Sequence, residues 1–284
     1  MKYVFIEENK DIFSIDVMCS FFNVSRSGYY SWLNKEPSKR ELTNKELDQK
    51  ITTIFEPNKS RYGAPRIARA LELHGDIYSL NRVARRMQKM KLKAIAKKKF
   101  KVTTDSEHAK PIYENILNRD FTTTSINQKW CSDISYVRTD EGWMYLEVII
   151  DLHSRAVIGW SMELRMTKDL VCNALIMALF KRKFPSEVII HSDRGSQYCS
   201  DKYRKLIKDN KLIGSMSRKG NCWDNAIAES FFHTLKVELV HENKYKTREE
   251  AKSSIFRYIE QYYNRIRLHS AIDYKAPIDV ELAV

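Results

Sequence analysis

The stretch Trp130-Cys131-Ser132-Asp133-Ile134-Ser135-Tyr136-Val137 decides the predicted fold, because it alternates in polarity and is rich in strand-forming residues. Two more strand-like segments follow at residues 143–151 and 156–162. Turn residues separate the three segments, at Glu141-Gly142 and at His153-Ser154-Arg155. Three short consecutive strands predict an antiparallel meander.

Further along the chain, helical and strand-like patterns alternate. The pattern predicts helices at 169–181, 200–208, 224–240 and 248–265, and short strands at 187–191 and 212–216. The order of these elements, βββαβαβα, predicts an α/β fold in which helices pack on one mixed five-stranded sheet.

The N-terminal third of the chain has a helical pattern throughout. We expect a helical pair at 11–34, a helix at 37–56, and a second helical pair that opens at Arg61-Tyr62-Gly63-Ala64-Pro65-Arg66. Pro65 suits a first helical turn, and Gly75 suits the end of that helix. A helix that follows a short turn has the size of a helix-turn-helix module, although helical hairpins of this size are also common in proteins that do not bind DNA.

Positive charge is concentrated in this helical region. The chain has a formal net charge of +13, and residues 51–110 alone carry 15 basic and 5 acidic side chains. The helix that begins after Ser79 has an apolar face and a basic face, and the basic face carries Arg82, Arg85, Arg86 and Lys89. These four residues are predicted to contact DNA, with a solvated charged surface as the alternative.

Composition excludes several classes of protein. No segment approaches the run of roughly 20 apolar residues that a membrane helix needs, and the N-terminus has no secretory signal. The five cysteines are scattered without Cys-x-x-Cys spacing, which argues against a zinc ribbon or a disulfide framework. We therefore expect a cytoplasmic protein.

Three acidic residues lie at positions that the predicted five-stranded sheet can bring close together. Asp133 lies inside the first strand, Asp193 follows the fourth strand, and Glu229 lies within a helix. Carboxylates are the ligands that Mg²⁺ prefers, and three of them suffice for two ions about 3.5–4 Å apart if one carboxylate bridges. Because the chain has 36 acidic residues, chemistry and position alone leave other triples open.

The residues around these acids resemble the D-D-E signature of retroviral integrases and related transposases, with 35 residues between Asp193 and Glu229. The motifs are most similar to those of the second-frame (OrfB) transposases of bacterial insertion sequences, and Arg61-Tyr62-Gly63-x-x-Arg66-Ile67 resembles the helix-turn-helix module of that family. The matching motifs are Trp130-x-x-Asp133-Ile134, His191-Ser192-Asp193-Arg194-Gly195-Ser196-Gln197-Tyr198, Gly220-Asn221-x-x-Asp224-Asn225-Ala226, Glu229-Ser230-Phe231-Phe232-x-x-Leu235-Lys236 and Tyr262-Tyr263-Asn264-x-x-Arg267-x-His269-Ser270-Ala271.

This resemblance implies a ribonuclease H-like catalytic fold and a transposase that cleaves and joins DNA at the ends of an insertion sequence. It implies that Asp133, Asp193 and Glu229 are catalytic and bind two Mg²⁺ (or Mn²⁺) ions. It also implies that Lys236, His233 and Asn225 contact the DNA end. The expected domains are a helical DNA-binding region with helix-turn-helix modules at 1–100, a linker at 101–120, and a catalytic core with a C-terminal helix at 121–284.

The resemblance also implies partners. These are the terminal inverted repeats of the element, target DNA and further copies of the chain on that DNA, in the bacterial cytoplasm at the nucleoid. Related proteins are often made as a frameshift fusion, and this chain has no coiled-coil heptads, so a first-frame protein is a possible partner. The alternatives are a metal-dependent nuclease, which uses only water as its nucleophile, and a DNA-binding regulator without catalytic activity.

Overall fold

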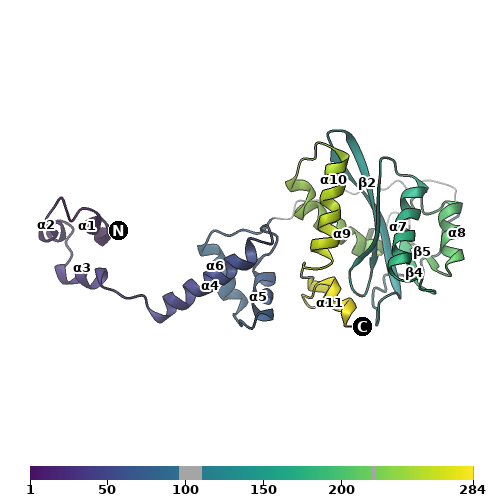
Figure 1. The fold of residues 1–284 in the computed structure, drawn as a ribbon. Coiled ribbons are helices and arrows are strands. Elements are labelled where there is room, and N and C mark those ends of the chain that lie inside the picture. The colour runs from purple at the N-terminus through teal and green to yellow at the C-terminus, as the bar shows by residue number, and fades with distance from the viewer. Residues whose placement is uncertain (96–110, 219–221, 284) are drawn as a thin grey trace.

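The computed structural model describes residues 1–95, 111–218 and 222–283. Figure 1 shows a helical N-terminal part followed by an α/β part. Residues 101–110, half of the predicted linker, lie outside the described residues, and residues 111–120 form no regular helix or strand. No helix in the described ranges is both long and apolar enough to cross a membrane.

The first helical unit contains one helix more than the predicted pair. Its helices are α1 (Lys2–Glu8), α2 (Ile15–Phe21) and α3 (Arg26–Leu33). The prediction of a helix from residue 11 is wrong, because α2 begins only after Ser14. Ile12 has an exposed fraction of 72%, so its helical spacing did not mark a buried face. The small core instead joins Ile6 of α1 to Tyr29 of α3.

The second helical unit agrees with the prediction. Its helices are α4 (Lys39–Phe55), α5 (Ala64–Leu73) and α6 (Leu80–Lys89). Pro65 lies in the first turn of α5, and Gly75 just beyond its end has a φ of +85°, which an L side chain rarely adopts. The Ser79 hydroxyl accepts a hydrogen bond from the backbone of α6.

The sheet confirms the predicted strands and the α/β fold class. It contains β1 (Lys129–Thr139), β2 (Gly142–Asp151), β3 (Val157–Glu163), β4 (Ile189–Ser192) and β5 (Ile213–Met216). The order is β3-β2-β1-β4-β5, with antiparallel pairing in the meander and parallel pairing of β1 with β4 and of β4 with β5. The strand that carries Asp133 is therefore the central one.

Helices cover both faces of this sheet (Figure 1). The helices α7 (Lys168–Lys181) and α8 (Asp201–Asp209) share one apolar core with the sheet residues Trp130 and Ile149. The helices α9 (Ala226–Glu238) and α10 (Arg248–Phe256) share a second core, which includes Val148. Adjacent strand residues point to opposite faces, which is why Val148 and Ile149 belong to different cores.

The two long C-terminal helices are less regular than predicted. The 3-10 segments η1 (Cys222–Asn225) and η2 (Val240–Glu242) flank α9, and α10 continues as a π-helix, η3 (Arg257–Tyr263). Two short elements were not predicted, η4 (Ser270–Ile272) and α11 (Pro277–Leu282). The π-helix has a wider turn than an α-helix, so a pattern of 3.6-residue period does not reveal it.

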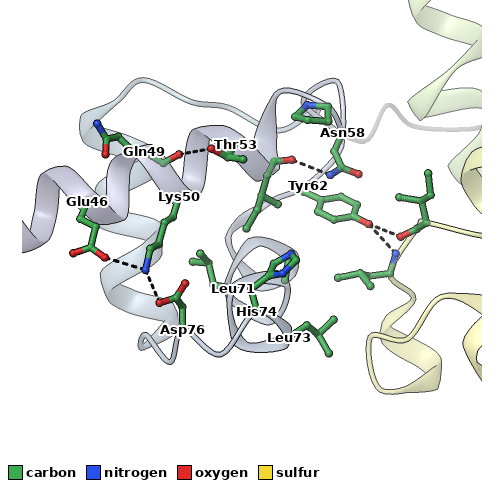
Figure 2. A pocket seen from close by; sticks show the side chains of 15 residues that line it. Glu46, Gln49, Lys50, Thr53, Asn58, Tyr62, Leu71, Leu73, His74 and Asp76 are labelled. Atoms are coloured by element: carbon green, nitrogen blue, oxygen red, sulfur yellow. Dashed lines mark hydrogen bonds and ion pairs between the residues drawn. The ribbon is translucent and has the colours of Figure 1, made fainter.

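The second helical unit contacts the C-terminal part of the α/β domain. The Tyr62 hydroxyl donates a hydrogen bond to the carbonyl of Ile266 (3.2 Å) and accepts one from the backbone N–H of Leu268 (2.9 Å), as Figure 2 shows. Arg61 Nε donates to the carbonyl of Glu238 (3.1 Å), and Arg66 Nε donates to the carbonyl of Leu268 (3.0 Å). These side chains of the Arg61-Tyr62-Gly63-x-x-Arg66 motif therefore hold the two parts of the chain together.

We expect Tyr62→Phe to loosen this contact, because the Leu268 N–H loses its acceptor and the Ile266 carbonyl loses its donor. The cost of leaving such groups unpaired is about 1–3 kcal/mol, so the Leu268 amide should exchange its hydrogen about tenfold faster or more. Native-state hydrogen exchange measures this rate. Tyr78→Phe is the matched control, because Tyr78 stacks on Arg82 within the helical unit. Unchanged exchange at Leu268 would contradict the contact.

Candidate active site

Asp133 lies in the middle of the central strand and is half-buried. Its pKa is raised well above the usual carboxyl value, first by burial and then by the nearby charges of Asp193 and Glu229. The three predicted acids are therefore close enough to repel one another. Such repulsion disfavours the charged form unless a cation is bound.

Asp193 follows β4, the parallel neighbour of β1. The register pairs Cys131 with His191, so Asp133 and Asp193 each lie two residues beyond a paired position, at the same edge of the sheet. Asp193 Oδ1 accepts a hydrogen bond from the backbone N–H of Gly195 at 2.8 Å. A Cβ atom at position 195 would lie 3.0 Å from this oxygen, so glycine allows the turn to close tightly under the carboxylate.

Glu229 lies in the first turn of α9, and the start of this helix is attached to β1. The side-chain amide of Asn225 donates a hydrogen bond to the carbonyl of Ser132 at 3.0 Å, directly before Asp133. Burial raises the pKa of Glu229, and the charge of Asp193 raises it further. The helix therefore brings the third carboxylate to the edge where the first two meet.

These carboxylates fit divalent cations by their chemistry. All three offer hard oxygen ligands, and burial together with the charges of neighbouring acids raises the pKa values of Asp133 and Glu229. Among the residues that the structure describes, no three His, Cys, Asp or Glu side chains are gathered tightly enough to share one ion. It is the donor chemistry of the three carboxylates that fits hard divalent cations.

Lys236, two turns beyond Glu229, lies inside the site rather than on its surface. It is buried, and its ammonium group lies 4.9 Å from the centre of the Tyr136 ring. Burial lowers its pKa, and the nearby charge of Asp133 raises it. Lys236 thus places a positive charge beside the acids, and His233, one turn earlier, is only half-buried.

Asn225 lies in the interior, directly before the first residue of α9. It is buried to 4% exposure, and its amide group is used by the Ser132 carbonyl. The amide therefore has a structural role, and the expected DNA contact of Asn225 stays a prediction. The sequence placed Asn225 on the polar stripe of a continuous helix, whereas the chain forms a 3-10 segment there, which turns the side chain inward.

The basic face of α6 is divided between two roles. Arg86 forms an ion pair with Asp48 of α4, and Arg82 donates a hydrogen bond to Asn44 at 3.2 Å. Arg85 and Lys89 are exposed. The structure therefore leaves Arg85 and Lys89 available to a ligand, while the other two arginines mainly hold α6 on α4.

Sequence reasoning missed Glu147, a carboxyl group with 0% exposure on β2. It accepts a hydrogen bond from the Tyr198 hydroxyl at 2.7 Å and also contacts the Ser132 hydroxyl. The signal was available, because Glu147 interrupts the apolar strand run Leu146-Glu147-Val148-Ile149-Ile150.

His191 of the motif is a structural residue of the sheet. Its two ring nitrogens lie 2.9 Å from the Ser215 hydroxyl and 3.0 Å from the Ser217 hydroxyl, so the ring links β4 to the strand beside it. Burial lowers its pKa to about 4, which keeps the imidazole neutral near pH 7.

Together, the sheet, its acidic edge and the helix-turn-helix region define a ribonuclease H-like enzyme of the integrase class. Residues 124–222 and 229–280 match models of an integrase core domain, and residues 41–100 match a helix-turn-helix-like domain. This chain belongs to the IS3 family of insertion-sequence transposases, since it is 48% identical over 272 residues to the transposase InsF for insertion sequence IS3A of Escherichia coli (strain K12), across 95% of this chain and 94% of that protein.

Two other proteins are also similar. The insertion element IS600 uncharacterized 31 kDa protein of Shigella sonnei is 43% identical, across 92% of this chain and 96% of that protein. Among solved structures, the simian T-cell lymphotropic virus intasome in complex with PP2A regulatory subunit B56 gamma aligns with a TM-score of 0.47 and 16% identity, over 75% of this chain and 69% of that chain.

Proposed function

We propose that this transposase cleaves phosphodiester bonds at the ends of its insertion sequence and joins the freed 3′-hydroxyl to another DNA strand. Asp133, Asp193 and Glu229 are the catalytic and metal-binding residues in this proposal. The observation that carries it is the position of Asp133 on the central strand, where Asp193 and Glu229 raise its pKa. Mg²⁺ or Mn²⁺, as a pair of ions, would supply charge neutralisation and orientation at phosphorus.

The side chains of the protein have separate roles in this reaction. Asp133, Asp193 and Glu229 would hold the ions, and the charges of both other acids act on Asp133. The Gly195 N–H holds one oxygen of Asp193 and so fixes its orientation. Lys236 places a positive charge next to Asp133, where it can attract the phosphate of the DNA end.

The same proposal assigns residues 1–100 to a DNA-binding region, 101–120 to a linker and 121–284 to the catalytic core. Its DNA partners are the terminal inverted repeats and the target strand. Because two ends must be joined in one complex, we propose that several copies assemble on DNA, with a first-frame protein as a further partner. The nucleoid is the corresponding place in the cell.

Arg85 and Lys89 are proposed to bind phosphates. We expect the double variant Arg85→Ser/Lys89→Ser to weaken DNA binding and to reduce the slope of log affinity against log salt by about 0.9 per lost contact. Binding to a terminal-repeat duplex at several salt concentrations measures this slope. Lys252→Ser, an exposed lysine on α10, is the matched control. An unchanged slope in the double variant would exclude α6 from the DNA interface.

The proposal is tested with labelled DNA that carries the terminal repeats of this element. Joined products should form with Mg²⁺ or Mn²⁺ and should be absent with EDTA. Cleavage without joining would instead identify a metal-dependent nuclease. Specific binding without cleavage, also after addition of a first-frame protein, would identify a DNA-binding regulator.

A further inference from the structure

A buried ring of three polar side chains lies behind the catalytic edge. Glu147 of β2, Ser132 of β1 and Tyr198 of the segment after Asp193 contact one another pairwise. All three are buried, with exposed fractions of 0%, 0% and 1%. A closed polar group of this kind in an apolar core is costly unless every member is hydrogen-bonded.

The ring lies on the opposite face of the sheet from Asp133. In the register of β1 and β2, Asp133 is paired with Val148, and Ile134 is paired with Glu147. Paired residues share a face, so the Glu147 side chain points toward the core beneath α7 and α8, while Asp133 points toward α9. Glu147 is therefore not a fourth ligand of the proposed metal site.

The number of protons in the ring determines which protonation form of Glu147 fits its three contacts. Tyr198 Oη lies 2.7 Å from Glu147 Oε2 and 3.2 Å from Ser132 Oγ, and Ser132 Oγ also contacts Glu147 Oε1. Two hydroxyl protons cannot serve three contacts. With a neutral acid, Glu147 donates to Ser132, Ser132 donates to Tyr198, and Tyr198 donates to Glu147, so that each contact has one proton.

The charges around Glu147 favour the same form. Burial raises its pKa well above the usual carboxyl value, the hydrogen bonds from Ser132 and Tyr198 lower it, and the charges of Asp133 and Asp193 raise it. The Tyr203 hydroxyl, which has no hydrogen-bond partner among the described atoms, also faces Ser132 from α8. The charged groups that act on Glu147 are thus carboxylates. A further ionised carboxylate behind Asp133 and Asp193 is therefore disfavoured.

Both catalytic aspartates are connected to the ring through the backbone. Ser132 is the residue before Asp133, and its carbonyl also receives the Asn225 amide from the start of α9. The Tyr198 N–H donates to the Gly195 carbonyl at 3.1 Å, and the Gly195 N–H in turn holds Asp193. A displacement of the Glu147 carboxyl group would therefore move both Asp133 and Asp193.

We propose that Glu147 is a positioning residue that, as a neutral acid, closes this ring and fixes the spacing between Asp133 and Asp193. The effect on catalysis rests on the proposed two-metal reaction, whereas the protonation and the ring do not. Glutamine at position 147 can replace the acid without loss, because its amide donates to Ser132 and its carbonyl accepts from Tyr198.

The first test does not depend on activity. Infrared difference spectra of the full-length protein at pH 8, wild type against Glu147→Gln, should contain the C=O band of a neutral carboxylic acid in wild type only. A difference confined to carboxylate bands would overturn the proposal. A second readout is the thermal unfolding midpoint, compared between the two proteins from pH 5 to pH 8.

The difference in unfolding midpoint changes with pH because the folded and unfolded chains bind the Glu147 proton with different affinity. The unfolded chain releases the Glu147 proton near the ordinary pKa of 4.5, whereas the folded chain retains it, so wild type loses stability as the pH rises above that value. The midpoint of Glu147→Gln, which carries no such proton, should rise relative to wild type with increasing pH. The opposite trend would show that the folded state stabilises the ionised form.

The third test measures strand joining and the Mn²⁺ concentration that gives half-maximal activity. Glu147→Gln should stay within about twofold of wild type, whereas Tyr198→Phe and Glu147→Ala should lose about tenfold or more and need more Mn²⁺. Equal loss in Gln and Ala variants that remain folded would overturn the neutral-acid ring. If wild type itself joins no DNA, the proposed function fails, while the infrared and stability results still decide whether the ring is neutral.

Discussion

Asp133→Asn should abolish strand cleavage and joining and, in EDTA, should also raise the thermal unfolding midpoint. Activity falls by about a thousandfold or more, because loss of a metal ligand removes several kcal/mol of transition-state stabilisation. Stability rises because burial and the charges of Asp193 and Glu229 hold the pKa of Asp133 above its usual value, so its ionised form destabilises the metal-free fold above about pH 4.

Joining assays and thermal unfolding at pH 7, each with and without Mg²⁺, measure both effects. Mg²⁺ should stabilise wild type and leave Asp133→Asn almost unchanged, because a ligand stabilises only a fold that binds it. Asp193→Asn and Glu229→Gln should lose activity in the same way. Asp140→Asn is the matched control, since Asp140 is exposed in the turn that follows the same strand. A folded Asp133→Asn protein that still joins DNA would exclude the proposed site.

Arg267→Met should lower the free energy of unfolding by about 3–5 kcal/mol, the cost of leaving a buried charge without its partner. Arg267 has an exposed fraction of 3%, and its Nη2 lies 2.8 Å from Oε1 of Glu238, which is 8% exposed. The Tyr258 hydroxyl also donates to Glu238 at 2.9 Å. Removal of the guanidinium leaves this carboxylate in the interior with only the more distant Arg66, whose Nη1 lies 4.0 Å from Oε1, as a cationic partner.

Denaturant unfolding of the full-length protein measures the loss. Arg265→Met is the matched control, because Arg265 is exposed two residues earlier, and it should change the free energy of unfolding by less than about 0.5 kcal/mol. Adding Glu238→Gln to Arg267→Met should recover part of the loss, because no buried charge then remains. Equal effects of Arg267→Met and Arg265→Met would show that the buried Arg267–Glu238 ion pair stabilises the fold no more than an exposed arginine does.

Periodicity predicted those elements whose side chains repeat against one neighbour. α4 to α6 were predicted because each buries one regular face, and β1 to β3 because they are rich in strand-forming residues between turn residues; the capping residues Ser79 and Gly75 marked helix ends. Periodicity failed at 11–14, where apolar residues are exposed, and at 257–263, where the turn is that of a π-helix. The periodicity of side chains along a segment does not show which other parts of the chain pack against them.

In the candidate site, too, some features were predicted from the sequence and others were not. The three acids were predicted from their motifs, and the structure places them at one edge of the sheet. The roles of Arg61, Arg66 and Asn225 were not predictable, because the acceptors of their hydrogen bonds are backbone carbonyls far away in the sequence. The partners of Glu147 were not predictable, because Ser132 and Tyr198 come together only when β1, β2 and the segment after β4 are side by side.

The sequence by itself determined the family and the order of the strands and helices along the chain, and it predicted the three carboxylates, because these depend on local periodicity and on residue type at fixed spacing. Only the tertiary structure decided which charges are paired within the fold and which remain exposed. Arg86 and Arg267 are paired internally, whereas Arg85 and Lys89 are exposed. The physical reason is that the environment of a charge depends on neighbours that folding brings from distant parts of the chain.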